Sequence, residues 1–135
     1  MIERDFQRLW GQWLKTNPSP NTIAYELKIV KNGRFSFDQV AAHQITGLQQ
    51  AKRGQYIKLQ DMSAVNGFAN PKPWDCVWVQ AKEAYVGVLF YTPRKPKKVL
   101  LVPIEEFIKL KEVWPKKSIH YDNLWVTPGV EAITL

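Results

Sequence analysis

Apolar side chains recur at helical spacing near the start of the chain. They occupy positions i, i+3, i+4, i+7 and i+8 of one stripe, which predicts an amphipathic helix over residues 3–15. The members of the stripe are Phe6, Leu9, Trp10, Trp13 and Leu14. The sequence Asn-Pro-Ser-Pro follows at residues 17–20, and two prolines cannot continue a helix. We therefore expect the helix to end before this segment.

Residues 22–30 alternate between apolar and polar side chains, which predicts a strand. A turn is expected at residues 31–34 and a second helix at residues 38–53. Ser36 and Gln39 have the spacing of a capping box at the start of this helix, and Gly54 suits its end.

The second half of the chain predicts further strands and one more helix. These are a strand at residues 55–60, a polar loop to residue 72, a hairpin of residues 74–80 and 84–91, a strand at residues 99–102, and a helix that begins with Pro103 and extends to residue 113. The last twenty residues have no assignable pattern. This order predicts one α/β domain over residues 1–135, with a mixed central sheet flanked by helices.

Charge and cysteine content narrow the classes of partner and compartment. The 135 residues include 19 basic and 12 acidic side chains, a net charge of +7, which makes a polyanion such as nucleic acid the leading partner. The single cysteine excludes a disulfide framework and a four-cysteine zinc site. The sequence has neither a membrane-length apolar run nor a signal-peptide pattern. We expect a cytoplasmic protein that does not bind a membrane.

Glu26 and Lys28 are the most informative pair for chemistry. They lie two residues apart in a predicted strand, so their side chains project from the same face. The carboxylate can hold a divalent cation, and the ammonium can orient an attacking water or stabilise charge on a phosphate. The alternative is a surface ion pair, which contributes little to stability.

Two further polar residues fall on apolar faces of the predicted helices. Glu3 lies on the side of the first apolar stripe, where it either turns toward a metal or favours the helix dipole. Gln44 falls among apolar residues of the second helix, and a buried amide needs a hydrogen-bond partner. It either positions the Glu26/Lys28 pair across the helix–sheet interface or bonds to a backbone group.

Residues 25–44, with the sequence YELKIVKNGRFSFDQVAAHQ, resemble the core of PD-(D/E)XK nucleases. The likeness is greatest to Holliday-junction resolvases of Gram-positive bacteria and related phage enzymes, and it covers residues 1–60. In that family a Glu-x-Lys strand precedes a turn, a Ser-Phe step into a helix and a His-Gln pair. The resemblance implies that Glu26 is a metal ligand, Lys28 the catalytic lysine, Gln44 a supporting catalytic-site residue and Glu3 an outer metal or water contact.

The same resemblance implies a restriction-endonuclease-like fold and Mg²⁺ or Mn²⁺ as cofactor. It also implies a substrate, which is a four-way junction or other branched DNA in a bacterial, archaeal or phage-infected cell. Symmetric cutting of two strands calls for a two-fold homodimer.

One feature of the family is missing at its usual place, because residues 6–25 contain no Asp or Glu before the Glu-x-Lys strand. Either the enzyme is inactive or the aspartate comes from another part of the chain. Asp75, in the sequence Lys-Pro-Trp-Asp, resembles the Pro-Phe-Asp entry of such sites and is the first candidate, as a catalytic residue and a metal ligand. Asp61 is the second candidate ligand, although it also suits a turn, as Asp75 suits a strand-entry cap.

Basic residues adjoin several predicted turns, where they can contact phosphates without reading bases. The candidates are Lys31, Arg34, Lys52, Arg53, Arg94, Lys95, Lys97 and Lys98. Solvated turns are the alternative. Our hypothesis is a metal-dependent endonuclease that resolves Holliday junctions. The rivals are another nuclease of the superfamily, of restriction or end-processing type, and an inactive nuclease fold that binds DNA.

Overall fold

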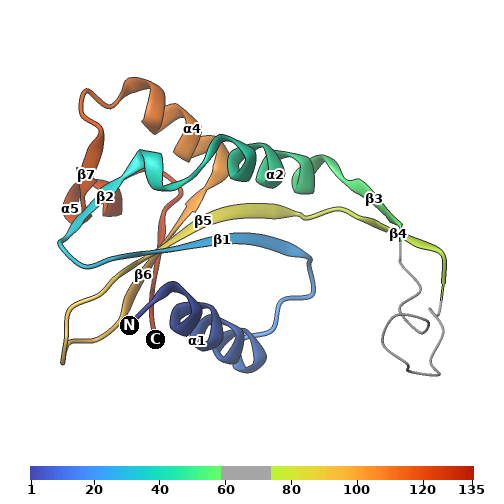
Figure 1. Ribbon diagram of the computed structural model, residues 1–135, viewed down its shortest axis with the longest axis horizontal. Helices are drawn as coiled ribbons and strands as arrows, with labels where there is room; N and C mark the ends of the chain where they lie inside the picture. Colours follow the sequence, from blue (N-terminus) through green and yellow to red (C-terminus); the bar gives the residue numbers. More distant parts are fainter. Residues whose placement is uncertain (59–73) are drawn as a thin grey trace.

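A four-stranded sheet forms the centre of the computed structural model, which describes residues 1–58 and 74–135 (Figure 1). In spatial order its strands are β1 (Ile23–Val30), β5 (Glu83–Phe90), β6 (Lys98–Pro103) and β8 (Glu131–Thr134). β1 is parallel to β5, whereas the β5–β6 and β6–β8 pairs are antiparallel. The predicted mixed sheet is therefore confirmed.

Helices cover both faces of this sheet (Figure 1). α1 (Glu3–Thr16) packs on one face, and α2 (Ala42–Arg53) and α4 (Ile104–Val113) pack on the other. Central strands that are covered on both sides need apolar residues at nearly every position, and β5 has the sequence EAYVGVLF. The chain is thus an α/β protein with a flanked central sheet, as expected. None of the described helices is long and apolar enough to cross a membrane.

Two apolar cores form, one on each face of the sheet. Beneath α1, Phe6 and Trp10 pack against Leu89, Val99 and Leu101. The larger core, beneath α2 and α4, includes Phe35, Phe37, Leu48, Val86, Val88, Leu100, Val102, Ile104, Phe107 and Ile119. The apolar stripe that predicted α1 is the stripe that this helix buries.

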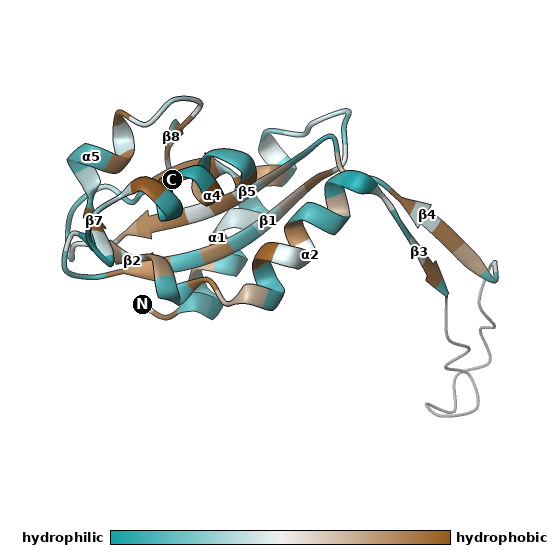
Figure 2. Cartoon of the chain, turned by 90° about the horizontal axis from the view of Figure 1, so that it is seen from above, coloured by the Kyte–Doolittle hydropathy of each residue, from teal (hydrophilic) through white to brown (hydrophobic). Residues whose placement is uncertain are grey.

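Short elements surround the sheet. β2 (Arg34–Ser36) pairs with β7 (Ser118–His120), and α5 (Tyr121–Trp125) follows β7 directly. β3 (Gln55–Lys58) pairs with β4 (Cys76–Val79) in an antiparallel hairpin. The β3–β4 hairpin extends away from the rest of the molecule beyond the end of α2 (Figures 1 and 2).

The predicted second helix is shorter than expected. Residues 37–39 form a separate 3-10 turn, η1 (Phe37–Gln39), and α2 begins only at residue 42. The Gln39 Oε1 accepts a hydrogen bond from the Ser36 N–H at 3.3 Å, so the predicted capping box closes η1 instead of α2. Val40 and Ala41 have extended backbones, because the chain must turn here before it crosses the sheet.

The predicted hairpin of residues 74–80 and 84–91 is wrong. Residues 76–79 pair with β3, while β5 uses both of its edges to pair with β1 and β6. The Ala81 N–H donates to the carbonyl of Ala51 at 2.7 Å, and the Lys82 N–H donates to the carbonyl of Thr22 at 2.8 Å. These bonds direct the chain from the hairpin into the sheet.

The structure differs from the expected elements at three further places. Pro103 ends β6 and caps α4 rather than opening the helix. The expected strand at 55–60 is described only to residue 58, and the expected loop to residue 72 lies outside the described residues. The C-terminal segment without an assignable pattern forms β7, α5 and β8.

Candidate functional site

The side chains of Glu26, Lys28 and Gln44 meet between β1 and α2. The Lys28 Nζ lies 3.3 Å from the Glu26 Oε1, and the Gln44 Nε2 donates to the same oxygen at 3.0 Å. The Lys28 side chain is 11% exposed and that of Glu26 is 25% exposed. This ion pair is therefore mostly shielded from water, unlike the surface pair weighed as the alternative.

Strand periodicity and helix capping together build this cluster. Glu26 and Lys28 share a face of β1 with Ala24 and Val30, both of which join the core beneath α2. Gln44 lies in the first turn of α2, where its Oε1 accepts the N–H of Ala41 at 2.9 Å. Both of the uses considered for the buried amide are thus present, because its oxygen caps the helix and its nitrogen holds Glu26.

One oxygen of Glu26 is left available. Lys28 and Gln44 both contact Oε1, and no hydrogen bond or ion pair within the described ranges involves Oε2. β1 is also an edge strand there, because its only partner within those ranges is β5. A ligand can therefore approach Glu26 from the open edge of the sheet.

The other predicted metal ligands do not join this cluster. Glu3 begins α1, which packs on the opposite face of the sheet, and it lies in the first turn where an acid favours the helix dipole. Asp75 is exposed and directly precedes β4 in the projecting hairpin. Asp61 lies outside the described residues. Within residues 1–58 and 74–135, no three His, Cys, Asp or Glu side chains are grouped so that they could hold a metal ion.

The predicted DNA-binding residues gather at opposite ends of the sheet. Lys31 and Arg34 follow β1. Residues 94–97 lie in the connection from β5 to β6, and Lys98 begins β6, at the same end of the sheet because Val30 is paired with Phe90. The Lys98 Nζ lies 6.0 Å from the ring centroid of Tyr121. Lys52 and Arg53 lie at the other end, in the last turn of α2.

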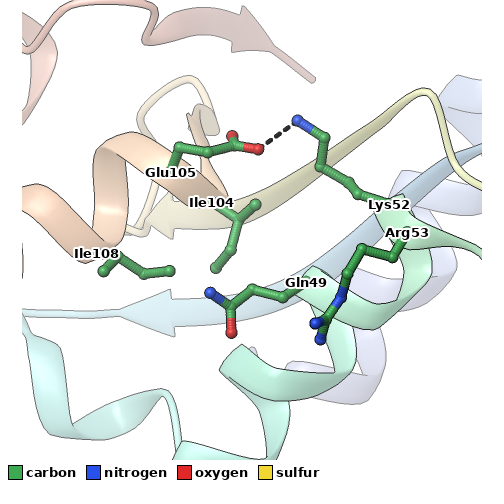
Figure 3. Close-up of a pocket in the computed structure, with 6 residues that line it drawn as sticks. All are labelled: Gln49, Lys52, Arg53, Ile104, Glu105 and Ile108. Carbon is green, nitrogen blue, oxygen red and sulfur yellow. Dashed lines mark hydrogen bonds and ion pairs between the residues drawn. The ribbon is translucent and has the colours of Figure 1, made fainter.

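Lys52 has two carboxylate partners. Its Nζ forms a hydrogen-bonded ion pair with Glu105 of α4 (Figure 3). The same Nζ lies 3.4 Å from the Glu83 Oε1 of β5. The hydrogen bond with Glu105 raises the pKa of Lys52 and lowers the pKa of the Glu105 carboxyl group. Lys52 and Glu105 border a cavity of about 420 Å³ between α2 and α4. Lys52 therefore links α2, α4 and β5, and two acids already offset its charge.

Gln39 contacts β1 beside the Glu26 cluster, and no sequence pattern indicated this contact. The Gln39 Nε2 donates to the backbone carbonyl of Ile29 at 3.5 Å, next to the cluster on β1. The capping-box spacing identified Gln39 as a local cap, but no sequence signal connects it with a strand ten residues earlier.

No protein-family model, curated protein or solved structure matches this chain. The geometry of the Glu26 cluster and the resemblance of residues 25–44 are therefore the grounds for a function.

Proposed function

We propose that this protein is a Mg²⁺- or Mn²⁺-dependent DNA endonuclease with a restriction-endonuclease-like fold, and that it cuts four-way junctions or other branched DNA as a homodimer. The observation that supports this proposal is the difference in contacts between the two carboxylate oxygens of Glu26. Lys28 and Gln44 both contact Oε1, while Oε2 has no partner within the described chain. A carboxylate held in this way is preorganised to bind a cation.

The donor set fits magnesium in part. Mg²⁺ is usually held by one or two protein carboxylates together with waters and substrate phosphates. Such a cation supplies charge neutralisation at a phosphate and lowers the pKa of a water. Lys28 offers an ammonium beside Glu26, which can orient a water or donate to a phosphate oxygen. Gln44 keeps the carboxylate in place.

A second carboxylate can reach Glu26 if the β3–β4 hairpin folds back along the open edge of β1. The foot of the hairpin is next to the start of β1, because Lys82 bonds to Thr22. Asp75 precedes Lys82 by seven residues, and Ile29 follows Thr22 by seven residues. At about 3.3 Å per residue both segments span about 23 Å, so an antiparallel alignment brings Asp75 opposite Ile29, next to Lys28. We propose that Asp75 completes the site in this arrangement.

An inactive DNA-binding module is the second candidate function. It is favoured by the single carboxylate beside Lys28 in the described chain, since phosphoryl chemistry with two metals needs several such ligands.

The test is cleavage of a labelled synthetic four-way junction and of linear duplex with the same sequence, in Mg²⁺, in Mn²⁺ and in EDTA. We expect paired nicks in the junction only when metal is present. E26Q and K28M should each lower the cleavage rate by about a hundredfold or more, because E26Q removes the charge of the proposed cation ligand and K28M removes the ammonium that would act on the phosphate. Both should retain junction binding in EDTA. Glu112 is exposed on α4, so E112Q is a matched control that should cut normally.

Variants of the two candidate aspartates separate the remaining alternatives. Loss of cleavage in D75N but not D61N supports the folded-back hairpin, whereas the reverse result assigns the ligand to Asp61. Normal cleavage by E26Q would refute the nuclease site. Tight binding with no cleavage in either metal would establish the inactive module, and equal cleavage of linear duplex would indicate another type of nuclease.

A further inference from the structure

A hollow lies at the C-terminal end of β1, next to the Glu26 cluster along the strand. Its volume is about 360 Å³, and we call it the exit pocket. Residues 29–30 line it together with the polar residues Lys31, Asn32, Arg34, Ser36 and Gln39. None of these residues belongs to the Glu26 cluster.

At the exit pocket, the side-chain amide oxygens of Asn32 and Gln39 accept local hydrogen bonds, and N–H donors of the same two amides remain for a ligand. The turn after β1 depends on Gly33, which has a φ of +76°, and the Asn32 Oδ1 accepts the N–H of Arg34 at 3.2 Å. The Gln39 Oε1 is likewise used by the N–H of Ser36. The NH₂ group of Asn32 has no partner in the described ranges, and the amide of Gln39 has a second N–H besides the one that bonds to β1.

The charge of the exit pocket is positive. Its lining contains Lys31 and Arg34 but no carboxylate, and neither cation forms an ion pair with any described residue. The acids of neighbouring elements are Asp38, exposed on η1, and Asp122, whose carboxylate lies 3.4 Å from His120. The cavity between α2 and α4 differs, because Glu105 lines it and pairs with its lysine.

The spacing from Lys28 suits the backbone of a nucleic acid. Lys31 follows Lys28 by three residues, which is about 10 Å along a strand. One DNA strand carries a phosphate about every 3.4 Å of helix axis. The basic residues Arg94, Lys95 and Lys97 lie at the same end of the sheet and extend the positive surface beyond the exit pocket.

We propose that the exit pocket binds a backbone phosphate of the DNA strand, two or three nucleotides from the phosphate at Lys28. This inference rests on the proposed function for its substrate class. Lys31 and Arg34 hold the phosphate, and the free amide N–H groups of Asn32 and Gln39 complete its hydrogen bonds. The pocket positions the strand so that the phosphate to be cut lies beside Lys28.

The experiment compares two double variants of the full chain that lose the same charge. K31Q/R34Q removes both cations of the exit pocket. R8Q/K15Q removes two exposed cations from α1, on the opposite face of the sheet. Binding to a fluorescent four-way junction is measured in EDTA over a series of NaCl concentrations. Cleavage by the unmodified protein in Mg²⁺ is measured separately, so failure of the nuclease proposal is recognised on its own.

We expect K31Q/R34Q to bind the junction about tenfold more weakly than the unmodified protein. The plot of log K for junction binding against log[NaCl] should become less steep by about 0.9, the value for one lost phosphate contact. R8Q/K15Q should stay within about twofold of the unmodified protein. Equal losses in the two variants would overturn the exit pocket and leave only a general charge effect. Absence of any junction binding by the unmodified protein would overturn it too. Binding without cleavage, with the expected difference between variants, would retain the pocket and refute the nuclease.

Discussion

The Glu26/Lys28 pair makes a specific prediction about stability. Replacing Glu26 with glutamine preserves its shape but leaves the Lys28 ammonium, only 11% exposed, without its counter-charge. Breaking a buried pair in this way costs about 3–5 kcal/mol. Because Glu26 is 25% exposed and some water reaches the pair, we expect E26Q to lower the free energy of unfolding by about 2–3 kcal/mol.

The reverse replacement should be milder. K28M retains the apolar stem of the lysine, and the remaining Glu26 carboxylate keeps its hydrogen bond from Gln44 and its partial exposure. We expect a cost of about 1 kcal/mol or less. The double variant E26Q/K28M removes both charges, so it should be more stable than E26Q alone. K28M then acts as a suppressor of E26Q, with a coupling energy of about 1–2 kcal/mol.

Urea denaturation followed by tryptophan fluorescence and far-UV circular dichroism would measure the four proteins of this cycle at pH 7. The cycle should be repeated in 1 M NaCl, which screens exposed pairs but has little effect on shielded ones. If the two single costs add to the cost of the double variant within about 0.5 kcal/mol, the residues do not interact and the geometric argument is refuted. The double variant E26Q/K28M also provides a folded protein that lacks both proposed catalytic groups.

Two further predictions concern the base of the hairpin and the link between helices. Gly54 has a φ of +93° and a ψ of 148°, and a Cβ there would collide with the Trp78 ring. G54A should therefore lower the free energy of unfolding by about 2–3 kcal/mol in urea denaturation. A change below about 0.5 kcal/mol would contradict this. Lys52 lowers the pKa of Glu105 below 4.5, so this contribution to stability is present above pH 4.5 and is lost as the pH falls through the lowered pKa. E105Q should therefore be less stable than the unmodified protein at pH 7, by less than about 1 kcal/mol, and their difference should vanish in acid; a difference that persists at pH 2 would exclude the ion pair as its cause.

Local patterns predicted most of the regular elements. α1 and β1 were found from apolar spacing, because a helix or strand that packs on a core must place apolar residues on the face it buries. The capping spacing of Ser36 and Gln39 was also real, although it closes a 3-10 turn. A side-chain cap depends only on residues three apart, so it identifies a turn without specifying how far the helix continues.

The site was predictable in the same partial way. The two-residue spacing of Glu26 and Lys28 placed them on one face, and the apolar neighbours of Gln44 placed it toward the sheet. Their meeting at a single oxygen depends on how α2 lies across β1, which no local pattern encodes. The sequence could not place Glu3 relative to this pair for the same reason, because it shows that α1 buries a face but not which side of the sheet receives it.

The sequence alone determined the positions of α1 and β1 and the apolar face of α1. It also determined that a carboxylate and an ammonium stand side by side on one strand. These properties depend on neighbours within a few residues. Only the tertiary structure decided that residues 76–79 pair with β3, that β5 lies between β1 and β6, and that β1 is left with an open edge in the described chain. Strand pairing is decided by competition among distant segments for the same backbone donors and acceptors and for cover on both faces of the sheet. The open edge beside Glu26, Lys28 and Gln44, on which the proposed site depends, is a result of that competition.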